Sequence, residues 1–239
     1  MKYIILLLIS AIFQLSCNTS TENNQLKESE AMKDTLASSK LVKSVEDSSS
    51  PKKIQIPDTA IVELKAADGN FVFNMKYATK DNFLNEQLYD CPKCLLRKKT
   101  VDALIKAGEL AKSKGYKIML FDCYRPLYIQ KKMWEIVNDP RYVANPKTGS
   151  IHNRGGAVDL TLTDMDGKPL DMGTKFDHFG KEAHHSFENI SSIVKQNRTL
   201  LKELMIESGF VPLNSEWWHY SLPEARKYTL GNTPIVCEK

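Results

Sequence analysis

The chain has 239 residues, of which 42% are apolar and 26% are charged, and its formal net charge is +4. A chain of this length and composition can bury a sizeable core, and the length predicts one or two domains. The net charge is small and no compact run of lysine and arginine is interleaved with aromatic residues. A nucleic acid is therefore not an expected partner.

The first residues read "MKYIILLLISAIFQLSC", which is one lysine, an apolar run too short to span a bilayer comfortably, and a cysteine at position 17. The segment resembles a bacterial lipoprotein signal, in which that cysteine is lipidated and becomes the mature N-terminus. Gln14 stands where leucine is usual in such signals, so plain secretion is the alternative. We expect residues 1–16 to be a signal peptide and Cys17 to anchor an exported protein to a bacterial membrane, facing the periplasm.

Residues 17–53 are rich in serine, glutamate, lysine and asparagine and contain no aromatic residue. Such a segment buries too little apolar surface to offset the entropy lost on ordering it. We expect a flexible tether, followed by a folded domain over residues 54–239.

The folded part begins with two expected strands, over residues 60–65 and 70–78, joined across the turn dipeptide Asp68-Gly69. Apolar residues at helical spacing then predict a helix over residues 95–114. Gly108 lies on the apolar face of this helix, where it costs about 1 kcal/mol relative to alanine but permits close packing.

The later elements alternate between the two types. Strands are expected over 116–124, 157–163 and 216–222, and helices over 126–137 and 191–208. Because they follow no regular βαβ repeat, the predicted fold class is α+β.

The stretch "SIHNRGGAVDLTLTD" combines a histidine, two glycines and an aspartate ahead of an apolar strand. His152 and Asp159 offer a nitrogen and an oxygen ligand, and the intervening glycines allow the backbone to bring both onto one metal ion. His219, in "EWWHY", is the best candidate for the third ligand. Two histidines and a carboxylate make a catalytic zinc site that leaves one position for water.

Glu216 precedes His219 by three residues and is the natural general base, because a carboxylate beside a metal-activated water can remove its proton. Any one of these four residues alone is more often an ordinary hydrogen-bonded side chain. Their combination is what favours a metallohydrolase.

The sequence resembles the VanX-like D-alanyl-D-alanine dipeptidases, zinc peptidases that share their core with bacterial D,D-carboxypeptidases. The family pattern Ser-x-His-x-x-Gly-x-Ala-x-Asp is matched by Ser150, His152, Gly155, Ala157 and Asp159, and Glu-x-x-His is matched by Glu216 and His219. "FDCYRP", "LDMGTKFD" and "ESGF" extend the resemblance. It implies a single compact domain, with a central and mainly antiparallel sheet flanked by helices, that binds one Zn²⁺ per chain.

The resemblance also implies roles for single residues. His152, Asp159 and His219 bind zinc, Glu216 acts as acid and base, and Arg125 stabilises the tetrahedral intermediate. Asp177 and Tyr77 meet the free ammonium of a small D,D-dipeptide substrate, and Ser150 lies near its carboxylate. Asp177 as a helix cap and Tyr77 as a core aromatic are the structural alternatives.

The resemblance implies zinc-dependent hydrolysis of D-Ala-D-Ala to two D-alanines outside the cytoplasmic membrane, in cell-wall peptide turnover or glycopeptide resistance. Two other functions remain open from the sequence. A D,D-carboxypeptidase would trim peptidoglycan stem peptides, and a non-catalytic zinc-containing lipoprotein would only bind peptidoglycan. Intact Glu216 and Arg125 argue against the second, because a binding module needs no base beside an open metal position. The sequence does not indicate an oligomeric state.

Four cysteines follow Cys17, at positions 91, 94, 123 and 237. An exported protein can form disulfides, and four cysteines allow three connectivities, among which the sequence does not choose. "CPKC" alternatively suggests a redox pair, although no thioredoxin-like context surrounds it.

Overall fold

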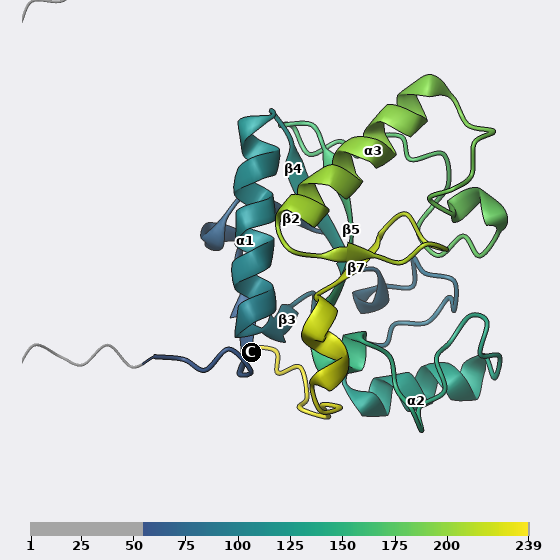
Figure 1. The fold of residues 1–239 in the computed structure, drawn as a ribbon. Helices are drawn as coiled ribbons and strands as arrows, with labels where there is room; N and C mark the ends of the chain where they lie inside the picture. The colour runs from purple at the N-terminus through teal and green to yellow at the C-terminus, as the bar shows by residue number, and fades with distance from the viewer. Residues whose placement is uncertain (1–54, 239) are drawn as a thin grey trace, which may run out of the picture. The chain divides into compact units, whose positions relative to one another are not determined.

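The computed structural model describes residues 55–238 (Figure 1). The predicted signal peptide, the lipidated Cys17 and the tether lie outside the described residues. No helix within residues 55–238 is both long and apolar enough to cross a membrane.

A five-stranded sheet forms the centre of the fold, in the order β2-β4-β5-β7-β6. Its strands are β2 (Phe71–Phe73), β4 (Lys117–Asp122), β5 (Ala157–Thr163), β6 (Val211–Pro212) and β7 (His219–Ser221). Only β2 and β4 are parallel, and the other neighbours are antiparallel. The expected α+β fold with a mainly antiparallel sheet is confirmed.

Helices α1 (Lys98–Ser113) and α3 (Ser192–Glu207) pack against each other and against the central strands (Figure 1). Their apolar residues join Val158, Leu160 and Leu162 of β5 in the main core. Since side chains alternate along a strand, Asp159 and Thr161 lie on the opposite face of the sheet. Helix α2 (Leu127–Ile136) contributes Ile129 and Met133 to a second apolar cluster.

Two expectations about the first elements are wrong. The strand expected over residues 70–78 ends at Phe73, because only β2 pairs with β4 and Lys76–Ala78 form a 3-10 helix, while β1 (Ile61–Leu64) pairs with β3 (Cys94–Arg97). Residues 95–97, expected to begin the first helix, belong to β3. In both cases pairing with a segment distant in sequence overrides the local pattern.

The bounds of the later elements agree more closely. Strand β5 has the predicted ends, and α3 lies within the predicted helix. The last strand is shorter than expected, because residues 216–218 precede β7 and include a bend, and Leu222 follows it. Gly108 allows the close packing expected of it, since a β-carbon there would lie 2.9 Å from the Phe71 ring.

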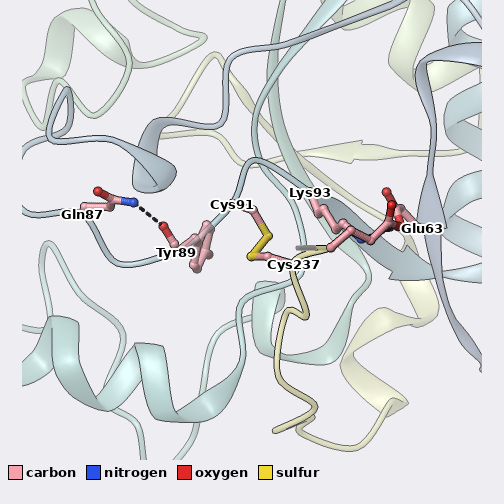
Figure 2. Close-up of a disulfide and its surroundings, with 7 residues drawn as sticks. Glu63, Gln87, Tyr89, Cys91, Lys93 and Cys237 are labelled. Carbon is pink, nitrogen blue, oxygen red and sulfur yellow. Dashed lines mark hydrogen bonds and ion pairs between the residues drawn. A yellow bond between two sulfur atoms is a disulfide. The ribbon is translucent and has the colours of Figure 1, made fainter.

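Two disulfides join the four cysteines, Cys91 to Cys237 and Cys94 to Cys123. The first ties the C-terminal segment to the loop before β3, beside Lys93, which forms an ion pair with Glu63 (Figure 2). Because Cys91 and Cys94 each bond a distant partner, "CPKC" is not a redox pair in this structure.

Candidate metal centre and active site

His152, Asp159 and His219 converge although 67 residues separate the first from the last, and their ligand atoms all lie within 4.8 Å of one another. The two facing ring nitrogens, Nε2 of His152 and Nδ1 of His219, are 3.1 Å apart. The carboxylate of Asp159 lies 3.2 Å from the first nitrogen and 2.9 Å from the second. Burial opposes ionisation of Asp159, but the two imidazoles hold the pKa of its carboxyl well below its usual range.

Sheet register brings two of these side chains together, because Asp159 of β5 is paired directly with His219 of β7. His152 precedes β5 in a short 3-10 helix that ends at Gly155, whose φ is +70°. Glycine adopts this left-handed conformation without the steric cost that other residues carry. The next residue also has to be small, since a β-carbon on Gly156 would lie 2.3 Å from that of Ala225.

A hydrogen bond at Nδ1, the ring nitrogen that does not face His219, fixes the orientation of His152. This nitrogen lies 2.7 Å from the carbonyl oxygen of Cys123. Donation to that carbonyl leaves the lone pair of Nε2 facing Asp159 and His219, which is the usual arrangement of a metal-binding histidine. The disulfide to Cys94 anchors the residue that supplies the carbonyl. Two imidazoles and one carboxylate, buried and mutually oriented, fit a catalytic zinc ion.

The three residues open into a cavity of about 410 Å³ that Ser150, Arg125, Asp177 and Glu216 also line. Glu216 is largely buried in its wall, and desolvation raises the pKa of its carboxyl. A raised pKa suits a carboxyl group that must both accept and return a proton. The Ser150 hydroxyl accepts a hydrogen bond from the backbone N–H of His152 at 3.2 Å.

Arg125 follows β4 and is held on two sides. Its Nε and Nη2 donate to the same Asp122 oxygen at 3.2 and 2.7 Å, and its Nη1 donates to Gln130 at 3.0 Å. The Tyr89 hydroxyl donates to the other Asp122 oxygen at 2.8 Å. The guanidinium is thus pre-oriented in the cavity wall, with N–H groups left over for a bound ligand.

Tyr77 and Asp177 form a pair, in which the phenol donates to the carboxylate at 2.8 Å. The Arg125 guanidinium lies 5.2 Å from the Tyr77 ring centre. Asp177 has φ +58°, an uncommon conformation for a residue with a side chain. Desolvation and the nearby Asp159 raise the pKa of its carboxyl well above the ordinary value. A cationic ligand beside Asp177 would stabilise the ionised form of this buried carboxyl group.

The profile of the D-ala-D-ala dipeptidase family matches residues 58–237, nearly the whole described part. This chain belongs to that family. A D-alanyl-D-alanine dipeptidase of Escherichia coli (strain K12) is 38% identical over 179 residues, which are 75% of this chain and 93% of that protein. One of Enterococcus faecium is 33% identical over 174 residues, 63% of this chain and 85% of that protein.

A similar solved structure is that of the vancomycin-resistance D,D-dipeptidase VanXYg in complex with a D-Ala-D-Ala phosphinate analog. It has 16% sequence identity and a TM-score of 0.36, over 70% of each chain.

The structure therefore gathers every site residue expected within the folded domain of this dipeptidase-family chain. Of these, only Tyr77 does not line the cavity itself, and its hydroxyl donates a hydrogen bond to Asp177, which does. Sequence reasoning missed the supporting residues Asp122, Tyr89 and Gln130. Asp122 had a visible signal, since it is an acid three residues before Arg125 at the end of an apolar strand. Tyr89 and Gln130 had none.

Proposed function

We propose that this chain is a zinc-dependent dipeptidase that hydrolyses D-Ala-D-Ala to two molecules of D-alanine. One observation carries the proposal: the His152, Asp159 and His219 ligand atoms share a cavity with Glu216 and Arg125. Membership of the D-Ala-D-Ala dipeptidase family supports the substrate. The cavity of about 410 Å³ is small enough to suit a dipeptide.

His152, Asp159 and His219 would hold the zinc ion, which supplies Lewis-acid polarisation of a water molecule and of the peptide carbonyl. Glu216 accepts a proton from that water as its oxygen attacks the carbonyl carbon. Glu216 then returns the proton to the peptide nitrogen, so that the C–N bond breaks and the second D-alanine leaves as a neutral amine.

Arg125 directs its free N–H groups at the oxygen on which negative charge develops. In a site shielded from water, one such donor contributes about 3 kcal/mol to the stability of the transition state. Asp122 and Gln130 hold the guanidinium before substrate arrives, so that little reorganisation is needed during the reaction.

Asp177, supported by the Tyr77 hydroxyl, binds the free ammonium of the dipeptide. The ammonium compensates the carboxylate that burial disfavours, which ionises Asp177 in the complex. A peptide with a blocked amino group leaves this acid without a cation. Ser150 lies on the cavity wall and binds the substrate carboxylate at the opposite end.

Glu216→Gln tests the assignment of metal and base together. We expect the variant to retain one zinc ion per chain and to lose D-alanine release by a factor of about 10³, within the range reported for loss of a general base. Removal of zinc with a chelator should abolish D-alanine release by the unmodified chain, and zinc should restore it. Full turnover by Glu216→Gln, or turnover that survives loss of all metal, would contradict the proposal.

We further propose that the protein is exported and anchored through a lipid on Cys17, and that it recovers D-alanine from cell-wall turnover. The two disulfides support an oxidising compartment. Dipeptide made as a wall precursor is cytoplasmic, so an exported enzyme fits recovery better than glycopeptide resistance. Cys17→Ala should release the protein from membranes into the soluble fraction, and persistent membrane association would point to another anchor.

A further inference from the structure

A second and larger cavity, of about 810 Å³, lies on the same face of the sheet as the candidate active site. Thr161 of β5 lines it, two residues beyond Asp159 and therefore on the same side of the strand. Strand β4 contributes Met119 and Phe121, and the segment 169–176 contributes the facing wall. None of the roles proposed above uses this cavity.

The wall contains a buried hydroxyl without a partner. Thr161 is 1% exposed, and no group within residues 55–238 forms a hydrogen bond with its Oγ1. The Asn74 side-chain nitrogen, also in the wall, contacts the sulfur of Met119 at 3.6 Å. Sulfur is a weak acceptor, so two side chains offer polar hydrogens that a bound molecule can accept.

The rim carries an excess of positive charge. Lys76 is neutralised by Asp81 at 2.6 Å. Lys80 and Lys175 also line the cavity, and neither forms an ion pair with any residue between 55 and 238. The remaining acid, Asp171, accepts a hydrogen bond from the Gly173 backbone at 2.8 Å. The rest of the lining is largely apolar and aromatic, with Phe83, Phe121, Phe176, Trp217, Met119 and Met172.

We propose that this cavity is a binding site for a small organic carboxylate with an apolar body. Lys80 and Lys175 attract the carboxylate, Thr161 and Asn74 donate hydrogen bonds, and the aromatic walls cover the apolar part. Most small-molecule sites combine an apolar lining with a few convergent polar groups in this way.

The two cavities share a wall. In three pairs of residues adjacent in sequence, one residue lines the second cavity and the other belongs to the candidate active site. Lys76, Phe176 and Trp217 line the second cavity, whereas Tyr77, Asp177 and Glu216 serve the candidate active site. The Phe176 ring packs against Phe121 at 5.0 Å and against Tyr77 at 6.1 Å between ring centres. A bound carboxylate should therefore change the KM for the dipeptide, a consequence that rests on the proposed function.

Methionine methyl resonances test binding without any reference to activity. The full chain, labelled with ¹³C at its methionine methyl groups, is titrated with 3-phenylpropionate and separately with neutral 3-phenylpropionamide. We expect saturable shifts of Met119 and Met172, with the millimolar dissociation constant typical of so small a ligand. Met133 and Met205 do not line the cavity and should stay unshifted. The amide should bind about tenfold more weakly.

Thr161→Val and Lys175→Gln should each weaken binding of 3-phenylpropionate about fivefold. Lys168→Gln is the matched control, because Lys168 is an exposed lysine outside the cavity, and it should leave the dissociation constant unchanged. Absence of saturable shifts up to about 10 mM, equal binding of the amide, shifts of Met133 and Met205 as large as those of Met119 and Met172, or an unaltered dissociation constant in Lys175→Gln would each overturn the proposal. Dipeptide hydrolysis is measured separately, so failure of the active-site assignment cannot be mistaken for failure of this one.

Discussion

Asp122→Asn is expected to damage both the fold and the active site, because Asp122 is the fully buried partner of Arg125. Its carboxylate accepts two hydrogen bonds from the guanidinium and one from Tyr89. The amide keeps the shape but removes the negative charge that compensates Arg125. Loss of one partner of a buried ion pair costs about 3 to 5 kcal/mol, since the remaining charge stays buried.

Tyr89→Phe is the matched control. It removes one hydrogen bond to the same carboxylate and leaves the ion pair intact. A hydrogen bond to a charged group is worth about 1.5 to 3 kcal/mol, so Tyr89→Phe should cost less than Asp122→Asn. Urea unfolding followed by tryptophan fluorescence gives both free energies.

Activity distinguishes a positioning role of Asp122 from a structural one. In buffer where each variant stays folded, Asp122→Asn should lower kcat for D-Ala-D-Ala at least tenfold, because Arg125 loses its fixed orientation. Tyr89→Phe should lower it much less. If Asp122→Asn unfolds at the same urea concentration as Tyr89→Phe and keeps full kcat, Asp122 neither stabilises the fold through Arg125 nor positions Arg125 for the reaction.

Three further predictions concern the expected metal ligand His152, the carboxyl group of Asp177 and the disulfide between Cys94 and Cys123. His152→Ala should strip zinc, as measured by metal analysis, and an unchanged zinc content would remove it from the site. The pKa of Asp177 is raised in the fold, so its contribution to stability is present below about pH 4 and is lost as the pH rises toward the folded pKa. Asp177→Asn should therefore lose less stability in urea between pH 5 and pH 8 than the unmodified chain, and an equal loss would contradict the raised pKa. The double variant Cys94→Ser, Cys123→Ser removes a disulfide whose cysteines have a sequence separation of 29, and it should lower the free energy of unfolding by about 3.6 kcal/mol. A loss below about 1 kcal/mol would show that this disulfide is not important for stability.

Local sequence patterns predicted those helices and strands whose tertiary contacts favour the same conformation as the local pattern. Strand β5 alternates apolar and polar residues and is central in the sheet, so its ends were predictable. The helix over Ser192–Glu207 has an N-cap, Ser191, whose side chain accepts from the Val194 N–H. The convergence of His152, Asp159 and His219 was predictable because a zinc site leaves few residue types and spacings that work.

Pairing between distant segments was not predictable from local pattern. The strand β3 begins with a cysteine and continues directly into helix α1, and only its pairing with β1 makes it extended. The disulfide connectivity depends on the same long-range geometry, since Cys94 lies on β3 and Cys123 follows β4. The role of Tyr89 could not be predicted, because nothing near it in sequence indicates a hydrogen bond to Asp122, 33 residues away.

The proposed dipeptidase reaction is tested by D-alanine release from free and from N-acetylated D-Ala-D-Ala, measured side by side with the zinc-loaded chain. We predict rapid cleavage of the free dipeptide and little or no cleavage of the acetylated one, because Asp177 is proposed to bind the free ammonium. Asp177→Ala should narrow that difference. Efficient cleavage of the acetylated peptide would contradict the dipeptidase assignment in favour of a D,D-carboxypeptidase, and cleavage of neither, with zinc bound, would contradict the proposed reaction itself.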